Sequence, residues 1–365
     1  MKHICFLMPG TGYNPIGGHK VVYEYANRFC NNNYKVSIIY PASLHWKKQS
    51  FKNKIVQIMW YFQNKLPYRS PYHWFNLNKK IALYNVWSLE EHNVPKADIY
   101  IATAIKTAMY LNDYKIAPNQ KIYFIQDYEN WSMPDEEVRA TYQYPMRKVT
   151  ISNWLHSIIS GVNAECDLVH NGFDFNYFQL TIPIYQKNKY RLTMMYNPGK
   201  RKGCVYGLKA LDIVKKEIPQ LQVTLFSTFP RPSFLPDWYT YFRCPDRNTH
   251  NRINNEASIY LASSNVEGWG LTVGEAMQCG QAVVCTDNLG YREMAVHNET
   301  ALVSPIKDSV QLAENIILLI RDDELRQRIA TNANLFIQKF TWERAFYKMK
   351  EIIDNNNYLT NSCIQ

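Results

Sequence analysis

The sequence of 365 residues lacks the features of several large protein classes. No stretch approaches the roughly 18 apolar residues that span a bilayer, and the apolar run at residues 4–8 is too short for a signal-peptide core. The eight cysteines include no C-x-x-C pair, and no histidines cluster at metal-ligand spacing, so neither a disulfide framework nor a zinc site is indicated. Internal repeats and low-complexity blocks are absent as well. We therefore expect a globular, cytoplasmic protein with reduced thiols, long enough for two domains.

Acidic residues are missing from one long stretch of an otherwise nearly neutral chain. Between His45 and Lys80, called the basic segment below, eight basic residues and no Asp or Glu supply +8 of the net charge of +10. The residues that we assign here to an acceptor-binding or membrane-facing surface are Lys47, Lys48, Lys52, Lys54, Trp60, Tyr61, Lys65 and Arg69. Basic and aromatic side chains together suit an anionic membrane or a stacking surface. The alternative is a solvated insertion loop whose aromatic side chains face the core.

Short apolar runs alternate with helical stripes in two series along the chain. The expected strands are residues 3–8, 35–40, 98–103, 121–126 and 148–152, and then 191–196, 223–226, 258–262 and 282–285. Helices with one apolar face are expected at 22–30 and 208–218, and further helices at 308–321, 323–339 and 342–354. This alternation predicts an α/β fold of two Rossmann-like domains that face each other across a cleft.

The densest cluster of candidate site residues lies between Ser263 and Gly280. A strand ends there, a loop with two glycines follows, and a helix begins near Thr272, so free backbone N–H groups are expected to form an anion site. Glu267 and Glu275 can both face one ligand and accept hydrogen bonds from sugar or ribose hydroxyls. Thr272-x-x-Glu275 also fits a capping box, in which Glu275 would only satisfy the helix's own N–H groups.

The run from Glu267 to Gly280 resembles the E-x7-E segment of retaining glycosyltransferases of family 4, which have the GT-B fold. Further segments resemble motifs of that family in the same order, namely Gly17-Gly18, His170-Asn171-Gly172-Phe173-Asp174, Arg201-Lys202-Gly203 and Phe340-Thr341-Trp342. The resemblance implies an acceptor-binding domain at 1–172 and a nucleotide-sugar-binding domain at 173–339. It also implies that 340–365 form a helix that returns to the first domain, followed by a tail.

The resemblance assigns roles to individual residues. It implies that Glu275 holds the ribose hydroxyls, that Glu267 lies beside the donor sugar, and that Lys202 neutralises the diphosphate. The other residues that it implies for donor binding are Gly17, Gly18, Arg201, Gly268, Trp269, Gly270, Leu271 and Thr272, the last three through backbone N–H groups. Fixed cations and helix amino termini stabilise the charge that a leaving nucleoside diphosphate gains.

The sequence departs from the family pattern at two places. The family commonly has an Arg six residues before the lysine of its phosphate-binding motif, where this chain has Tyr196, so Arg201 is the candidate for a second cation. Many members have a His after the strand that corresponds to 121–126, where this chain has Asp127. Asp127 is our candidate to orient the donor sugar or to accept the acceptor's proton, with loop capping as the alternative.

The implied activity is transfer of a hexosyl group from a nucleotide sugar to a glycan or lipid-linked acceptor, with retention, in bacterial glycan assembly. The enzyme would act in the cytoplasm or peripherally on the inner face of the membrane, and nucleic acid is not an expected partner. No Asp is followed by another Asp two positions on, so we expect neither a metal nor a cofactor besides the donor substrate. Two alternatives stay open: an epimerase or hydrolase on the same scaffold, and a non-catalytic basic protein that binds membranes or nucleic acid.

Overall fold

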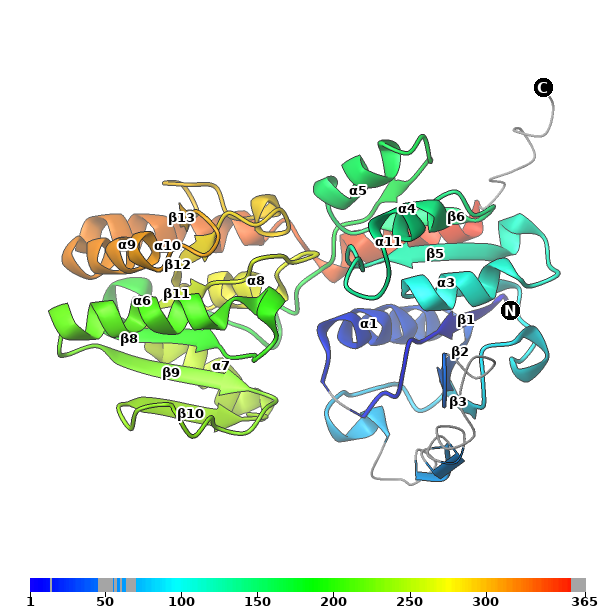
Figure 1. Cartoon of the computed structure of the whole chain (residues 1–365), viewed down its shortest axis with the longest axis horizontal. Coiled ribbons are helices and arrows are strands. Elements are labelled where there is room, and N and C mark those ends of the chain that lie inside the picture. Colours follow the sequence, from blue (N-terminus) through cyan, green and yellow to red (C-terminus); the bar gives the residue numbers. More distant parts are fainter. Residues whose placement is uncertain (14, 45–54, 56–57, 60, 64–69, 356–365) are drawn as a thin grey trace. The chain divides into compact units, whose positions relative to one another are not determined.

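A computed structural model describes residues 1–13, 15–44, 55, 58–59, 61–63 and 70–355 (Figure 1). It divides into two compact units. The first comprises the described residues of Met1–Asn171 together with those from Glu343 onward, and the second comprises Gly172–Trp342.

The first unit is built on a parallel sheet with the strand order β3-β2-β1-β4-β5-β6-β7. Its strands are β1 (His3–Leu7), β2 (Lys35–Pro41), β3 (Ala82–Val86), β4 (Ile99–Ala102), β5 (Lys121–Ile125), β6 (Arg147–Thr150) and β7 (Asp167–Leu168). The central strands β1, β4 and β5 are buried along their whole length, as their continuous apolar runs predict for a sheet covered on both faces.

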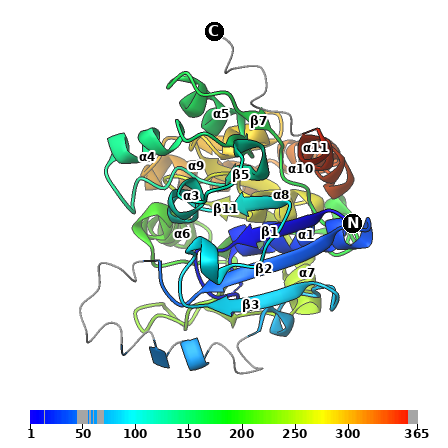
Figure 2. The ribbon, with the colours of Figure 1, turned by 90° about the vertical axis from the view of Figure 1, so that its right-hand side faces the viewer.

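Helices cover both faces of this sheet. They are α1 (Gly17–Asn31), α3 (Ile105–Asn112), α4 (Asp135–Thr141) and α5 (Asn153–Ser160). The β1–α1–β2 and β4–α3–β5 crossovers run in opposite directions across the sheet, so right-handed connections place α1 and α3 on opposite faces (Figure 2).

The last helix, α11 (Trp342–Asp354), joins the first unit and packs beside α1. The rings of Phe346 and Phe29 meet edge to face, with centroids 5.1 Å apart. Lys2 Nζ donates to the carbonyl of Ile353 at 3.0 Å, and the Tyr34 hydroxyl donates to Asp354 Oδ1 at 2.6 Å. The expected return of the C-terminal helix is confirmed.

The second unit contains a parallel sheet with the strand order β10-β9-β8-β11-β12-β13. Its strands are β8 (Asn188–Met195), β9 (Gln222–Ser227), β10 (Tyr239–Arg243), β11 (Ala257–Ala262), β12 (Ala282–Thr286) and β13 (Ala301–Ser304). Its helices are α6 (Cys204–Glu217), α7 (Arg247–Glu256), α8 (Leu271–Gln278), α9 (Ser309–Arg321) and α10 (Asp323–Ile337). Helix α9 packs against α6, while α10 packs against α8 and β12. Two Rossmann-like α/β domains were predicted, and this is confirmed.

Both sheets share a reversal of winding that positions the site. In the first unit the chain winds outward in one direction from β1 and in the other from β4, and in the second unit it does so from β8 and β11. Ligands of open parallel sheets bind at the carboxyl ends of the strands at such a switch point. In the first unit the segment after β1 lies at this point, and in the second unit the segments after β8 and β11 do.

Candidate functional site

Two segments meet at the switch point of the second unit. A single 3-10 turn, Lys200–Lys202, follows β8, and the loop 263–270 follows β11. These strands are hydrogen-bonded neighbours, so their carboxyl ends lie together. The carbonyl of Arg201 accepts from the N–H of Asn265 at 2.7 Å, and the side-chain amide of Asn265 donates to the carbonyl of Lys200 at 2.9 Å. These bonds fix the turn and the loop to each other.

Gly203 makes the close approach of these two segments possible. Its φ of +56° is left-handed, and a Cβ at this position would overlap the carbonyl oxygen of Ser263. Only glycine satisfies both conditions without strain. The backbone of Arg201-Lys202-Gly203 therefore lies directly against the loop that carries Glu267.

Lys202 and Glu267, predicted from separate motifs, form an ion pair. Lys202 Nζ lies 2.7 Å from Glu267 Oε1 and 2.8 Å from Oε2, and the Ser264 hydroxyl donates to Oε1 at 2.7 Å. The side chains are 30% and 13% exposed, so the pair is partly screened from water. Part of the positive charge that Lys202 would offer to an anion is therefore already balanced by Glu267.

Two buried tyrosines, Tyr260 and Tyr291, feel the charge of Glu267, and the sequence did not indicate them as site residues. Burial raises the pKa of Tyr260, and the carboxylates of Glu275 and Glu267 raise it further. Burial also raises the pKa of Tyr291, with Glu267 as the next largest cause. Both phenols therefore stay protonated and uncharged. The carboxylates of both Glu267 and Glu275 thus act electrostatically on Tyr260, a residue of strand β11.

Helix α8 begins at the same place. Its N-cap is Gly270, with φ +109°, and no side chain caps its first N–H groups. Thr272 is the second residue of the helix and Glu275 the fifth, whereas a capping box requires its Thr at the N-cap. Thr272 and Glu275 therefore do not form a capping box. The N–H of Val273 donates to the carbonyl of Gly270 at 3.0 Å, and the N–H groups that precede it at the helix start suit an anion.

Glu275 itself is 6% exposed, and its carboxylate lies within electrostatic reach of Tyr177. Burial raises the pKa of Tyr177, and Glu275 is the next largest cause. A buried carboxylate beside a neutral phenol suits the recognition of hydroxyl groups, which both accept and donate hydrogen bonds. The assignment of Glu275 to the ribose stays a prediction.

Trp269 takes a different place from the other residues of the loop. Its side chain is 3% exposed and packs between the rings of Phe173 and Phe340, with centroid distances of 6.3 and 5.2 Å. Its indole thus joins the loop to the residues around 173 and 340, where the chain passes from one unit to the other. A contact of Trp269 with donor would have to come from its backbone.

Tyr196, an uncharged residue, occupies the position where the family commonly has Arg. It is 8% exposed and packs edge to face on Tyr241 at 6.2 Å. The half-buried Arg201 uses its backbone carbonyl to hold the loop, and its predicted role as a second cation stays a prediction. Among the residues that the structure describes, no three His, Cys, Asp or Glu side chains are grouped to hold a metal ion.

The switch point of the first unit carries Gly17 and Gly18 at the start of α1, whose N-cap has no side-chain bond. A Cβ on Gly18 would lie 3.5 Å from the side-chain amide of Gln126, which follows β5. His19 is 5% exposed, and burial lowers its pKa to about 4. The ring of His19 is therefore neutral near pH 7, and this end of α1 presents backbone N–H groups without a nearby charged histidine.

Asp127 follows β5 at the same edge of the first sheet. Its Oδ1 accepts a hydrogen bond from the N–H of Tyr128 at 2.8 Å, so the carboxylate supports its own loop. This is the loop-capping alternative. The role of Asp127 toward sugar or acceptor stays a prediction.

Most of the residues that we assigned to the basic segment's surface lie outside the described residues. These are Lys47, Lys48, Lys52, Lys54, Trp60, Lys65 and Arg69. No described helix is long and apolar enough to cross a membrane.

The described aromatics of the basic segment divide between core and surface. Phe75 is buried against Tyr23, and Trp74 Nε1 donates to the carbonyl of Gly12 at 2.8 Å, as the core-facing alternative predicts. Tyr72, in contrast, is 44% exposed. Tyr61 stacks on Trp87, which comes directly after strand β3, with ring centroids 3.8 Å apart.

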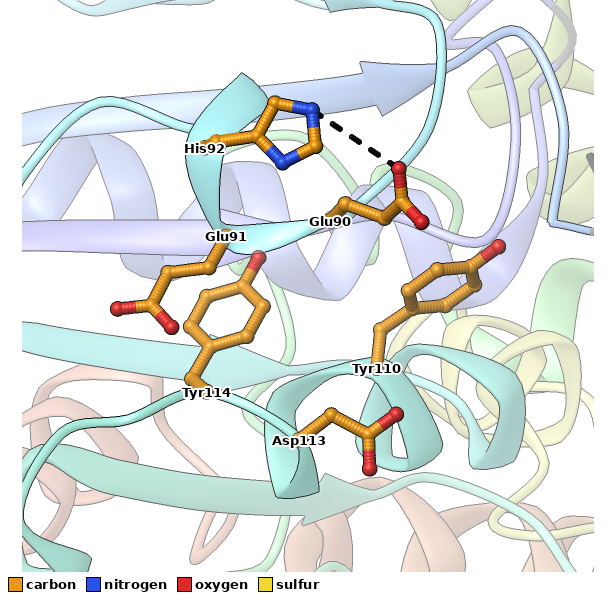
Figure 3. Close-up of a pocket in the computed structure, with 6 residues that line it drawn as sticks. All are labelled: Glu90, Glu91, His92, Tyr110, Asp113 and Tyr114. Carbon is orange, nitrogen blue, oxygen red and sulfur yellow. Dashed lines mark ion pairs between the residues drawn. The ribbon is translucent and has the colours of Figure 1, made fainter.

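The first unit also contains a pocket of about 290 Å³ beside the carboxyl end of α3 (Figure 3). Its lining residues are Glu90, Glu91, His92, Tyr110, Asp113 and Tyr114. His92 Nε2 lies 3.9 Å from Glu90 Oε2, and the Tyr114 hydroxyl donates to the carbonyl of Leu89 at 2.8 Å. Three carboxyl groups around one pocket would repel a diphosphate, so this pocket does not suit a nucleotide sugar.

Known proteins resemble this chain at two levels. Residues 239–336 match the family model "Glycosyl transferases group 1". An uncharacterized glycosyltransferase of Methanocaldococcus jannaschii is 27% identical over 99 residues, which are 27% of this chain and 28% of the relative. The N,N'-diacetylbacillosaminyl-diphospho-undecaprenol alpha-1,3-N-acetylgalactosaminyltransferase of Campylobacter jejuni is 36% identical over 75 residues, 20% of each chain. The matched segments thus span only a fifth to about a quarter of these relatives.

The similarity of fold extends over nearly the whole chain. The crystal structure of Anabaena HepE in complex with UDP-glucose superposes with a TM-score of 0.71 at 16% identity, covering 97% of this chain and all of HepE. The fold is GT-B. The family match includes Glu267, Glu275 and the start of α8, whereas Lys202 and the first unit lie outside it.

Proposed function

We propose that this chain is a glycosyltransferase that takes a sugar from a nucleotide-sugar donor. The observation that carries the proposal is the Lys202–Glu267 pair, held at the free amino terminus of α8 and at the switch point of the second sheet. The match of residues 239–336 to group 1 glycosyltransferases supports it, because that match contains the loop and helix of this site.

The donor would bind with its diphosphate at the start of α8. Backbone N–H groups of the first turn and the ammonium of Lys202 would stabilise the charge that develops as the glycosidic bond breaks. The ammonium of Lys202 would donate hydrogen bonds to both Glu267 and the diphosphate. One lysine would then connect the sugar side of the donor to its phosphate side. Glu275 would hold the ribose.

The reaction proposed is a same-face displacement with retention. The acceptor oxygen forms a bond to the anomeric carbon, the bond from that carbon to the diphosphate oxygen breaks, and the acceptor's proton passes to the leaving diphosphate. In this scheme Glu267 stabilises the positive charge on the sugar, and no covalent intermediate on the enzyme is needed.

The acceptor would be a glycan or a lipid-linked glycan. The name of the Campylobacter jejuni relative contains a diphospho-undecaprenol, which supports a lipid-linked acceptor. Asp127 in the first unit would face this acceptor. Peripheral attachment to a membrane belongs to the same proposal.

The stereochemistry is tested by NMR of the product's anomeric proton after transfer from a donor of known configuration. We expect the donor's configuration to be kept. An inverted product would mean that Glu267 has been assigned the wrong role and that a base such as Asp127 activates the acceptor for rear attack.

Metal independence is tested with excess chelator in the same assay. We expect activity to persist, because Lys202 and the helix terminus provide positive charge and the sequence has no Asp-x-Asp pair. Activity lost to chelator and restored by Mg²⁺ or Mn²⁺ would contradict this part of the proposal.

A further inference from the structure

An arginine of the second unit lies over an aromatic ring. Arg247 is an exposed residue in the first turn of α7, and its guanidinium carbon is 4.7 Å from the ring centroid of Tyr177, within the range of a cation–π interaction. The N–H of Tyr177 donates to Asp174 Oδ1 at 3.2 Å. The next residue, Phe178, is buried and packs edge to face on His250 of α7, with centroids 5.1 Å apart. These contacts hold Tyr177 beside the first turn of α7.

Helix α7 touches the end of helix α8 one turn away from this arginine. The thiol of Cys279, the C-cap residue of α8, donates to Asn251 Oδ1 at 3.6 Å. Residues four apart share a face of a helix, so Arg247 lies on the face of α7 that carries Asn251. In the same way, Glu275 lies on the face of α8 that leads to Cys279. Arg247 and Glu275 are therefore each one turn nearer the amino end of two helices that touch.

The sheet topology places both amino ends at the proposed donor site. Helix α7 follows β10 and α8 follows β11, and all strand pairings from β10 to β12 are parallel. The chain moves in one direction along the sheet from β10 to β11 and on to β12, so right-handed crossovers put α7 and α8 on the same face. The carboxylate of Glu275 also acts electrostatically on Tyr177. Arg247, Tyr177 and Glu275 thus form one group at the carboxyl edge of the sheet.

The chemistry of this group suits a nucleobase. The proposed function puts the ribose at Glu275, and the base is bonded directly to the ribose. A guanidinium is planar, stacks on flat rings and carries only N–H donors. Uracil, thymine and guanine present a carbonyl oxygen on the edge where cytosine and adenine present an amino group. An arginine therefore favours the carbonyl bases, because an amino group would face it donor to donor.

We propose that Arg247 selects a nucleotide-sugar donor whose base presents a carbonyl oxygen, and that Tyr177 positions its guanidinium. The inference rests on the proposed function, because it takes the ribose to be held at Glu275, and it adds the base to that site. The ring of Tyr177 restricts the arginine side chain before the base arrives, which reduces the entropy lost on binding. The neighbouring Asp246 serves α7 itself, because its Oδ1 accepts from the N–H of Thr249 at 2.7 Å.

Isothermal titration calorimetry of the full chain with UDP, CDP, GDP and ADP tests this selection. Within the pyrimidine and the purine pair, the first member carries the carbonyl oxygen and the second an amino group in its place. We expect the carbonyl member of the tighter-binding pair to bind at least about tenfold more tightly than its partner. In Arg247→Gln this preference should fall to about threefold or less, because an amide side chain both donates and accepts. Arg247→Lys, which only donates, should keep the carbonyl base ahead.

The matched control is Arg252→Gln, because Arg252 is also an exposed arginine of α7 and lies 6.0 Å from the ring centroid of Phe242. It should keep the wild-type order of bases, and thermal unfolding without ligand verifies that each variant folds. An unchanged base preference in Arg247→Gln would overturn the inference. So would an equal loss for all four ligands, because Arg247 would then act on the diphosphate.

The wild type separates this inference from the proposed function. If it binds the four nucleoside diphosphates equally, the base selection is wrong while the proposed activity stands. If it binds none of them, the proposed function fails and the inference fails with it.

Discussion

At the switch point of the second unit, Lys202 and Glu267 form an ion pair at 2.7 Å, whereas in the first unit the backbone of Gly18 lies against the uncharged amide of Gln126. The two sheets have the same parallel winding and the same free helix amino terminus after a central strand. Equal topology thus supports different chemistry. The second unit concentrates charge where a leaving diphosphate would need it, while the first offers close backbone approach.

This difference assigns different tasks to the helix amino termini. At α8 the dipole acts together with a lysine, so its effect on an anion is reinforced by a full charge. At α1 the nearest histidine is neutral because burial lowers its pKa to about 4. We expect substitutions at the second switch point to change the rate of the chemical step, and those at the first to change how closely a ligand approaches the backbone.

The largest effect is expected from Lys202→Gln. Removing a fixed cation from a leaving group typically costs about 3–4 kcal/mol of transition-state stabilisation, so kcat should fall about 10²- to 10³-fold. The matched control is Lys200→Gln, because Lys200 is an exposed lysine of the same turn. Steady-state release of nucleoside diphosphate measures both variants. Equal loss in both would show that the turn contributes only diffuse charge.

A comparison of two glycines sharpens the contrast in backbone geometry. Gly270→Ala should destabilise the second unit by about 1–3 kcal/mol, because φ is +109° and a Cβ would overlap the ring of Tyr291. Gly18→Ala should be neutral or slightly stabilising, since its Cβ would make ordinary contact with Gln126 at 3.5 Å. Amide hydrogen exchange in α8 reports the stability of the second unit, and exchange in α1 reports that of the first. Faster exchange in α1 of the Gly18 variant would contradict this reading of the first switch point.

The strands predicted well from the sequence are those that are buried on both faces, because such strands are continuous apolar runs. Strands β1, β5, β11 and β12 are completely buried and were predicted within two residues of their ends. Strand β3 was not predicted, because it is an edge strand in which only Val86 is buried. Helix α7 was missed because its ten residues include a single apolar side chain, Ile253, and no stripe.

The site was predictable as motifs but not as an arrangement. Lys202 and Glu267 were each singled out, yet their ion pair depends on β8 and β11 becoming neighbours although many residues separate them. The burial of Trp269 likewise depends on Phe173 and Phe340, which are distant in sequence. Local patterns predict elements and candidate residues, whereas contacts between strand ends follow from the winding of the sheet.

A smaller effect is expected from Glu275→Gln at the second switch point. Losing charge-assisted hydrogen bonds to ribose hydroxyls costs about 1.5–3 kcal/mol, which weakens nucleoside diphosphate binding by at least tenfold. Glu299→Gln, an exposed glutamate of the same unit, is the control. Isothermal titration calorimetry measures both. A folded Glu275→Gln variant that binds as tightly as wild type would remove this residue from the donor site.

The smallest effect concerns pH at the first switch point. Burial lowers the pKa of His19 to about 4 from its ordinary value of 6.5, so the unfolded chain binds more protons than the folded one between these values. The contribution of the neutral His19 ring to folding stability is therefore complete above pH 6.5 and is lost progressively as the pH falls toward 4. From pH 7 to pH 5 the loss is about 2 kcal/mol at most, since one pKa unit corresponds to about 1.4 kcal/mol.

Hydrogen exchange in α1, corrected for the intrinsic rate, should show this loss in wild type and a smaller one in His19→Gln, while exchange in α8 should not respond to the substitution. An identical pH response of α1 in both proteins would mean that His19 does not titrate in this range, and that the neutrality of the first switch point has another cause.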